Sequence, residues 1–233
     1  MPDAPDAASL DPVPPKEGRR AVQRRALLAD IEAEARRLLV EGGAGNVSMR
    51  AIARGVGLGP ASLYNYFDSL DDVFLMLLLT SYERLATATT AAVAAFAKEP
   101  PADRAFAGIL AHRHWAVAHP HEFNLIFTDL LPGFEAPEGG PTVAAQVAVF
   151  QPMMDALAEV YPDETDLTPG ELSVILWSAF HGIVTLEVNH HLDWLGHLPA
   201  LHEKAVRRSF AAVGLPEPSA TIRRRFERWV ARG

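Results

Sequence analysis

A run of fifteen residues without a charge constrains the fold of this chain more than any other feature. It extends from Leu172 to Leu186 and reads LSVILWSAFHGIVTL. A helix that is apolar on every side must be covered on every side, and the run is shorter than the roughly 20 residues that a membrane span needs. We therefore expect a buried helix at 168–191 in a soluble protein that has no membrane partner.

The expected helix at 168–191 has two apolar faces when successive residues are placed about 100° apart. The first face holds Val174, Trp177, His181, Val184 and Val188. The second face holds Ile175, Ala179, Gly182, Ile183 and Leu186, and its small residues permit close approach of another helix. We predict that the first face lines a domain interior and that the second packs against another copy of the chain, giving a homodimer. A central helix within a monomer is the alternative.

The rest of the chain shows a helical period between breaks rich in proline and glycine. Helices are predicted from Arg19 to about Glu41, after Ser48, and at 60–66, 69–97, 102–118, 120–131, 142–161 and 199–213. No stretch alternates with period two for long enough to form a strand. With 233 residues, of which 49% are hydrophobic, the chain can bury a sizeable core. We predict an all-α fold.

Composition excludes several functional classes. The chain has no cysteine, so disulfide scaffolds, thiolate zinc sites and cysteine nucleophiles are excluded. No Ser-His-Asp spacing, glycine-rich phosphate loop or pair of buried carboxylates stands out, and we expect no enzyme and no cofactor. The opening segment MPDAPDAASLDPVPP does not resemble a signal peptide, which favours a cytoplasmic protein.

Charge is distributed unevenly along the chain. The formal net charge is -8, yet residues 16–67 carry nine basic and five acidic side chains, which sum to +4 and leave -12 for the remainder. This asymmetry suggests a basic module attached to an acidic one. A basic module is compatible with a nucleic-acid partner, and ordinary variation of surface charge along the chain is the alternative.

The basic segment contains a candidate helix-turn-helix. Ser48 is placed to cap a short helix, Gly57 can form the turn, and Pro60 can open a second short helix. Such a pair of helices can place the second helix in the major groove of DNA. The outward face of that helix would carry Pro60, Ala61, Tyr64 and Asn65, while Leu63 and Phe67 would point inward.

The residues themselves carry a more specific signal. The segments Ser48–Ala53, Val56–Leu58, Ser62–Phe67 and Ser69–Asp72 resemble the N-terminal signature of the TetR family of transcriptional regulators. The resemblance covers about residues 20–75, and its L-Y-x-[HY]-F core lies at a fixed distance from the Ile52-Ala53 pair. A weaker match, Trp177-x-x-x-His181-Gly182, resembles the W…HG signature of one C-terminal subfamily.

The resemblance implies roles for individual residues. Arg50 would reach a base edge, with guanine its expected partner. Base contacts of an apolar kind are implied for Pro60, Ala61 and Tyr64, and phosphate contacts for Ser48, Ser62, Asn65 and Tyr66. A flexible arm bearing Arg19, Arg20, Arg24 and Arg25 would add phosphate or minor-groove contacts. The family's usual lysine is Leu70 here and its usual serine or threonine is Gly59, so direct readout of bases is expected to be thin.

The acidic half is rich in aromatic side chains. In the family this half holds an effector cavity, and the candidate lining residues are Tyr82, His112, Trp115, Phe127, Phe150, Met153, Trp177 and His181. We expect a mostly apolar or aromatic ligand, which would bind by burying apolar surface and by accepting or donating one or two hydrogen bonds with the histidines. Glu187 and His190 form one Glu-x-x-His, whereas a di-iron site needs two, so no metal site is expected.

These observations predict four segments. Residues 1–18 form a disordered arm, 19–68 a helix-turn-helix DNA-binding domain with its motif at 48–67, 69–214 an effector-binding and dimerisation domain, and 215–233 a basic C-terminal tail in the form of a short solvated helix. We expect a homodimeric repressor that binds double-stranded operator DNA and is released from it by a small-molecule effector. The alternatives are an all-α small-molecule carrier or a metalloenzyme with a vestigial helix-turn-helix.

Overall fold

The computed structural model describes residues 18–128, 134, 138–162 and 165–232. In these residues the chain is helical and contains no strand, which confirms the predicted fold class. The helices are α1 (Arg19–Gly42), η1 (Ala44–Asn46), α2 (Met49–Gly55), α3 (Pro60–Leu63), α4 (Leu70–Ala95), α5 (Pro101–Ala118), α6 (Pro120–Phe127), α7 (Pro141–Ala158), α8 (Pro169–Val188), α9 (Leu198–Ala212) and α10 (Ile222–Val230).

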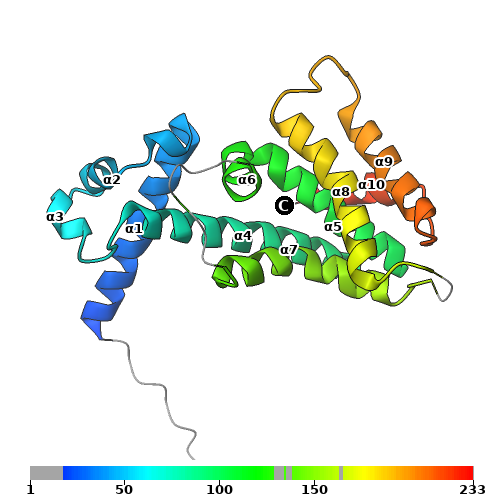
Figure 1. The fold of residues 1–233 in the computed structure, drawn as a ribbon, viewed down its shortest axis with the longest axis horizontal. Coiled ribbons are helices and arrows are strands. Elements are labelled where there is room, and N and C mark those ends of the chain that lie inside the picture. The colour runs from blue at the N-terminus through cyan, green and yellow to red at the C-terminus, as the bar shows by residue number, and fades with distance from the viewer. Residues whose placement is uncertain (1–17, 129–133, 135–137, 163–164, 233) are drawn as a thin grey trace, which may run out of the picture.

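Helices α1, α2 and α3 form a small unit at one end of the molecule (Figure 1). Its interior holds Ile31 and Leu39 of α1, Ile52 of α2 and Leu63 of α3, all fully buried. Burying each of these side chains contributes about 1.5–3 kcal/mol. This packing holds two very short helices that would not persist alone in water.

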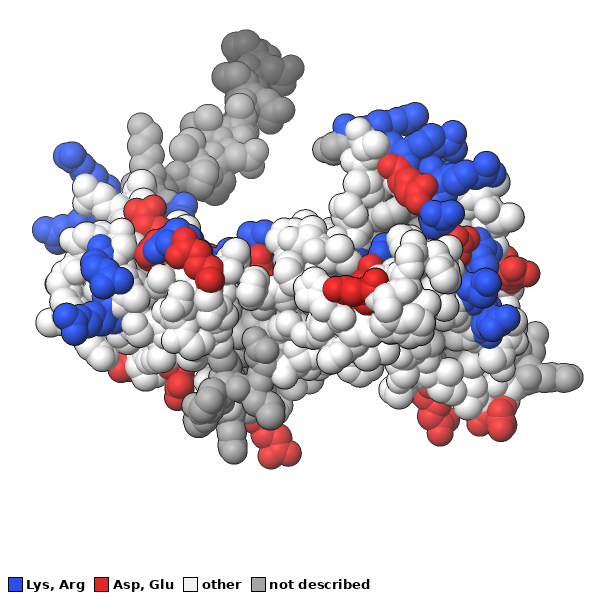
Figure 2. All heavy atoms as spheres, turned by 90° about the horizontal axis from the view of Figure 1, so that it is seen from above, with Lys and Arg blue, Asp and Glu red and all other residues white. Residues whose placement is uncertain are grey.

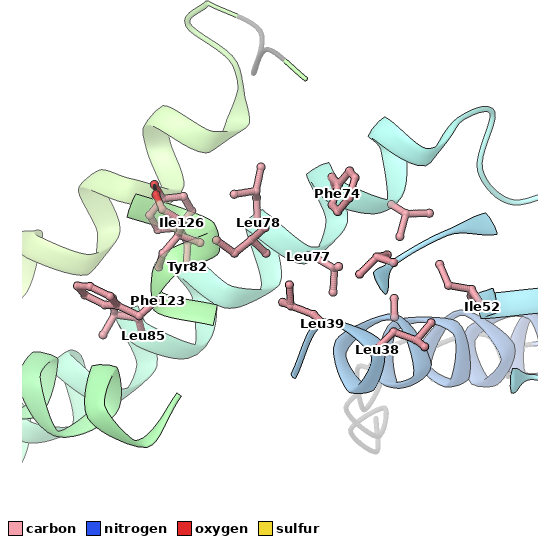
Figure 3. Packing of buried hydrophobic residues seen from close by; sticks show 14 of the residues in the cluster. Leu38, Leu39, Ile52, Phe74, Leu77, Leu78, Tyr82, Leu85, Phe123 and Ile126 are labelled. Atoms are coloured by element: carbon pink, nitrogen blue, oxygen red, sulfur yellow. Dashed lines mark hydrogen bonds between the residues drawn. The ribbon is translucent and has the colours of Figure 1, made fainter. Parts of the chain in front are cut away.

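Helix α4 extends from the small unit through the larger one (Figure 1). It begins with a capping box, in which the Ser69 hydroxyl accepts from the Asp72 backbone N–H and the Asp72 carboxylate accepts from the Ser69 N–H. Its Leu77 lies in one apolar cluster with Leu38 of α1 and Phe123 of α6 (Figure 3). The two units therefore share a continuous hydrophobic core through α4.

The larger unit consists of the far part of α4 together with α5–α10 (Figure 1). A second apolar cluster fills its outer end, where Phe106 of α5, Phe180 of α8 and Phe210 of α9 are buried. Met153 of α7 is also buried there, beside Gly108 of α5, where an added Cβ would lie 2.5 Å from the Met153 Cγ. Gly108 thus lets α5 and α7 approach closely.

Several helix ends differ from the predicted ones. Regular helix in α3 stops at Leu63, although the turns that follow keep the hydrogen bond from the Tyr66 N–H to the Leu63 carbonyl. Helix α6 ends at Phe127 and not at 131, and the predicted continuation at 129–131 lies outside the described residues. Residues 1–17 of the predicted arm lie outside them as well.

The C-terminal segment is not a solvated helix, as we had expected from its arginines. Helix α10 packs against α5, and its Ile222 and Phe226 are buried in the second cluster. Its arginines also make specific pairs, since Arg223 bonds Glu203 and Arg225 bonds Glu99. The strong amphipathicity of this short helix reflects docking onto the larger unit.

The two faces of α8 are also assigned differently from the prediction. The inward residues repeat every four positions as Leu172, Leu176, Phe180, Val184 and Val188, and Trp177 and His181 are half-buried beside them. Val174 was predicted to face inward but is 57% exposed. Within the described part of the chain, one apolar side of α8 is therefore exposed.

Helix α8 is also, within the described residues, the one helix long and apolar enough to cross a membrane by length and composition. The uncharged run alone is too short, but the whole helix from Pro169 to Val188 reaches 20 residues. Its inward residues belong to both apolar clusters of the structure, and 28% of the apolar stretch is buried.

Candidate DNA-binding and effector sites

The first helix of the candidate motif begins at a side-chain cap. Ser48 is extended, with φ -150° and ψ 149°, and its hydroxyl oxygen accepts from the Ala51 backbone N–H at 3.2 Å. This cap starts α2 at Met49, which is buried, and leaves Arg50 exposed at the second helical position. A buried side chain thus fixes the helix while the neighbouring guanidinium remains free to reach a partner.

The turn between α2 and α3 depends on a left-handed glycine. Gly57 has φ +71°, a conformation that residues with a Cβ rarely adopt. Pro60 then occupies the first position of α3 after the extended Gly59. This geometry presents Pro60, Ala61, Tyr64 and Asn65 to solvent and buries Leu63, as predicted.

Tyr64 is the largest side chain on the outward surface of α3. It is 52% exposed, whereas Tyr66 and Ser62 are half-buried. Tyr64 follows directly after the last residue of α3, as its C-cap, and about half of its side chain is exposed to solvent. Its position fits contact with a partner surface.

Basic side chains surround this motif, and they lie on α1 and not on a flexible arm. Arg19, Arg20, Arg24 and Arg25 belong to the first two turns of α1 and are exposed. The guanidinium of Arg24 lies 5.6 Å from the ring centre of Tyr66, a contact that sequence reasoning did not find. Figure 2 shows Lys and Arg side chains at this end of the molecule and again at the opposite end.

The larger unit contains an aromatic cluster around His112, here called the His112 cluster. Ring centres lie 5.2 Å from His112 for Phe180, 5.7 Å for His181, 5.8 Å for Phe123, 6.1 Å for Phe127 and 6.2 Å for Phe150. Trp177 joins the cluster, 5.1 Å from His181 and 5.4 Å from Phe150. These side chains come from α5, α6, α7 and α8.

Five predicted lining residues therefore meet, namely His112, Phe127, Phe150, Trp177 and His181. Tyr82 lies at the edge, where its ring packs 5.8 Å from Phe127 and its hydroxyl donates to the Ile126 carbonyl at 2.8 Å. Burial raises the pKa of Tyr82 to about 12. The hydroxyl of Tyr82 is thus already used within the protein.

Two predicted lining residues lie elsewhere. Trp115 stacks on His119 with ring centres 4.9 Å apart, and Met153 is a core residue beside Gly108. Phe123 and Phe180 take part instead and were missing from the predicted set. Their signal was their spacing, since Phe123 lies four residues before Phe127 and Phe180 lies next to His181.

Several polar atoms in and beside the cluster are buried and have no hydrogen-bond partner among the residues that the structure describes. They are both ring nitrogens of His112, Nδ1 of His181, Nε1 of Trp177 and Oγ1 of Thr185. Burial lowers the pKa of His181 to about 4 and that of His112 well below its usual value, the latter also through the neighbouring His181 and His202. Both imidazoles are therefore neutral at pH 7.

Open space adjoins the cluster. A cleft of about 110 Å³ lies against Phe150, Trp177 and Phe180, and its remaining lining is Met154, Ser173 and Val174. An apolar cavity of similar order can hold a benzene-sized molecule. The cleft and the unpartnered polar atoms meet at Trp177.

The Glu-x-x-His of α8 does not assemble a metal site. The Glu187 carboxylate accepts from Arg113 of α5, with 2.8 Å to Nε, and Nδ1 of His190 lies 3.0 Å from the carboxylate of Asp193 at the surface. Across the described part of the chain, no group of three or more His, Asp or Glu side chains is arranged to hold a metal ion.

The geometry so far defines a class of protein. A short helix, a glycine turn and a second short helix with an exposed outer face form a helix-turn-helix, and a long helix joins it to a larger helical domain. Family models match both parts: "Bacterial regulatory proteins, tetR family" over residues 31–77 and "Tetracyclin repressor-like, C-terminal domain" over residues 104–213. Together they cover more than half of the chain, which belongs to the TetR family.

Curated relatives agree with this assignment. The chain is 32% identical over 141 residues to the HTH-type transcriptional regulators Rv1816 of Mycobacterium tuberculosis and Mb1846 of Mycobacterium bovis. Each match covers 60% of this chain and 60% of the relative, so the chain spans less than two thirds of their length.

Solved structures share the fold. A regulatory protein, SCO4313, aligns with a TM-score of 0.70 and 23% identity, covering 84% of this chain and 100% of that one. A TetR transcriptional regulator from Rhodococcus sp. RHA1 aligns with a TM-score of 0.55 and 17% identity, covering 82% and 97%. The fatty acid degradation regulator FadR from Bacillus halodurans gives 0.54 and 16%, covering 78% and 97%. At these identities the likeness concerns the fold.

Proposed function

We propose that the protein is a cytoplasmic, homodimeric transcriptional regulator that binds operator DNA through α2 and α3 and responds to a small-molecule effector. The observation that carries this proposal is the exposed surface of Arg50, Pro60, Ala61, Tyr64 and Asn65 in a domain of TetR type. The backbone that carries these side chains is held by a buried core, and the side chains themselves are exposed. They are arranged for an external partner.

The roles on DNA follow from chemistry and position. Arg50 offers a planar pair of donors that matches the O6 and N7 acceptors of guanine. Pro60, Ala61 and Tyr64 provide apolar contact with base edges, including thymine methyl groups. Ser48, Ser62, Asn65 and Tyr66 donate to phosphates, and the arginines at the start of α1 add phosphate contacts that position the domain.

Homodimerisation follows from the uncovered side of α8 and from the geometry of DNA. Val174, Ile175 and Leu186 are 57%, 39% and 43% exposed, and a Cβ added at Gly182 would meet nothing within 4 Å. Two recognition helices reach successive major grooves only when a two-fold partner places them about 34–36 Å apart. Packing of α8 against α8 of a second copy would bury this apolar side and would also provide the two-fold-related DNA-binding domain.

Helix α6 connects the His112 cluster to the DNA-binding domain. Its Phe123 and Phe127 belong to the cluster, and its buried Glu122 accepts from Arg36 of α1 and from the Ser81 hydroxyl of α4. Arg36 also donates to Thr80 Oγ1 at 2.7 Å. A ligand that displaces α6 would move this ion pair and hence α1. The ligand releases DNA only if it favours the arrangement that does not bind operator.

The test is binding of the purified full-length protein to DNA taken from upstream of its own gene, measured by fluorescence anisotropy between 50 and 200 mM salt. We expect specific binding that weakens by about 10³-fold or more over this range, because several phosphates are neutralised. A panel of apolar compounds should then include some that release the DNA. A small-molecule carrier with a vestigial motif would show no such binding, and that result would refute the proposal.

A further inference from the structure

The His112 cluster presents hydrogen-bonding groups to no visible partner. His112 is fully buried, and neither of its ring nitrogens is bonded. Buried polar side chains are almost always paired, because leaving one unpaired costs about 1–3 kcal/mol. Unpartnered atoms on three neighbouring rings, His112, His181 and Trp177, indicate a place built to receive a polar group from outside the chain.

The electrostatics of the cluster restrict what that group can be. None of the cluster residues carries a charge, and two charged side chains of the adjoining helices are already paired, Glu122 with Arg36 and Arg113 with Glu187. An anion or a cation in the cluster would be buried without a counter-ion, at a cost far above that of a neutral group. The cluster therefore disfavours carboxylates and ammonium groups.

The hydrogen-bonding capacity of the cluster restricts the group further. A neutral imidazole has one N–H donor and one nitrogen acceptor, and the ring centres of His112 and His181 lie 5.7 Å apart. A hydroxyl can donate to one of these rings and accept from the other, which a hydrocarbon, an ether or a carboxylate cannot do. The indole N–H of Trp177 offers a further donor.

The shape of the adjoining space restricts the remainder of the ligand. The cleft of about 110 Å³ beside Trp177 is bounded by Phe150, Met154, Val174 and Phe180 and by one small polar residue, Ser173. It suits an apolar group about the size of one ring. Trp177, Phe150 and Phe180 belong both to this cleft and to the His112 cluster, so a molecule in the cleft lies against three of the rings that surround the two histidines.

We infer that the effector is a neutral, ring-sized apolar molecule bearing one hydroxyl, held between His112 and His181 with its apolar part beside Trp177. This inference rests on the proposed function and adds the chemical class of the effector. The hydroxyl should distinguish the effector from apolar analogues, because a site that hydrogen-bonds a ligand hydroxyl binds an analogue without that hydroxyl much more weakly.

The experiment compares three probes of similar size, namely phenol, toluene and benzoate, by ligand-observed NMR with the full-length protein at pH 7.5 and without DNA. We expect phenol to bind at least tenfold more tightly than toluene, and benzoate to give no detectable binding. Equal affinities for phenol and toluene, binding of benzoate as tight as that of phenol, or no binding of phenol would each overturn the inference.

Variants locate the site. His181→Phe and His112→Phe should each weaken phenol binding about tenfold, which corresponds to one lost hydrogen bond of about 1.4 kcal/mol, and should leave toluene binding within twofold. The matched control is His119→Phe, which alters a histidine stacked on Trp115 outside the cluster. Unchanged phenol binding in His181→Phe would overturn the inference even if His112→Phe failed to fold.

The same probes separate this inference from the proposed function. Phenol that binds as described but never changes operator affinity supports the ligand class and refutes the regulatory coupling. Operator release by toluene or benzoate at concentrations as low as those of phenol refutes the ligand class and supports the regulator.

Discussion

The helix-turn-helix and the interior of the larger domain differ in whether their buried polar groups have hydrogen-bond partners. In residues 18–103 no buried side-chain nitrogen or oxygen lacks a partner, and the Ser48 and Ser69 caps show why. In the larger domain both rings of the His112–His181 pair carry unpartnered atoms, as does buried His202 of α9. In the first region every buried side-chain donor and acceptor is thus paired within the chain, whereas in the second some are not paired by the described residues.

This difference indicates where each region does its work. The DNA-binding domain directs its functional side chains outward from a fully satisfied core, so a partner adds contacts at the surface. The larger domain directs its polar side chains inward, where burial makes each hydrogen bond count for more and each missing one costly. A surface that binds DNA needs exposed polar side chains, whereas an interior that binds a small molecule needs buried ones with free hydrogen-bonding capacity.

The largest expected effect is a selective loss of stability of the larger domain in acid. The pKa of His112 lies well below its usual value and that of His202 is lowered to about 3, both by burial first. Below pH 6.5 the unfolded chain therefore binds protons that the folded chain excludes, so stability is complete above pH 6.5 and falls as the pH falls. At about 1.4 kcal/mol per pH unit, the shift of His202 alone should cost about 2 kcal/mol at pH 5, and the buried His112 adds to this loss in the same direction.

The measurement is thermal unfolding between pH 7.5 and pH 5, followed by tryptophan fluorescence, since the four tryptophans all lie beyond residue 114. Hydrogen exchange would follow the α1–α3 unit, which contains no histidine and should keep its local protection. Replacing His202 by Phe should reduce the pH slope, and the slope that remains should come from His112 and His181. A larger domain whose stability does not change down to pH 5 would contradict the prediction.

The next effect concerns the uncovered side of α8. Gly182→Asp should leave the monomer folded, because nothing lies within 4 Å of the added Cβ, but it should place an unpaired charge in the dimer interface. We expect monomers at micromolar concentration in analytical ultracentrifugation and a loss of operator affinity of about 100-fold or more. Gly182→Ala is the matched control and should dimerise normally. A dimeric Gly182→Asp protein would exclude this face as the interface.

A smaller effect is expected on the outward surface of the DNA-binding domain. Arg50→Ala should weaken operator binding by about 1–3 kcal/mol and relax specificity at one base position. Arg228→Ala is the control, because Arg228 is also exposed but lies on α10 at the opposite end of the molecule. Competition with mutated operators would measure both the operator affinity and the specificity at each base position. Equal losses in the two variants would mean that Arg50 makes no specific contact.

The smallest effect concerns the caps, which occur in both regions. Ser48→Ala removes the acceptor for the Ala51 N–H at the start of α2, and Thr168→Ala removes the acceptor for the Glu171 N–H at the start of α8. Each should cost about 1 kcal/mol in the free energy of unfolding. Only Ser48→Ala should also weaken operator binding. Urea denaturation and anisotropy measure the two quantities independently.

Local signals predicted the DNA-binding domain in detail. The Ser48 cap, the Gly57 turn, Pro60 at the start of α3 and the buried Leu63 all depend on residues within a few positions of one another. Such features follow from backbone sterics and capping, which act over one turn of helix. The arrangement of Arg24 over Tyr66 could not be predicted in this way, since it joins α1 to the turn after α3, about forty residues further along the chain.

The His112 cluster was predicted only in part. Aromatic residues at helical spacing indicate that a face is apolar, but they do not indicate which apolar neighbour it meets. Trp115 and Met153 satisfied the same criteria as Phe150 and Trp177, yet the first stacks on His119 and the second fills the space beside Gly108. Selection among them depends on how four helices cross.

The sequence by itself determined the helices, their caps and turns, and the identity of the DNA-binding motif, because these arise from interactions between residues close together in the chain. Only the tertiary structure decided that α10 docks through Ile222 and Phe226, that α8 leaves Val174 exposed, and that His112 lies among five rings without a hydrogen-bond partner. Each of these depends on the angle and distance between helices far apart in sequence, and packing of the whole core sets both.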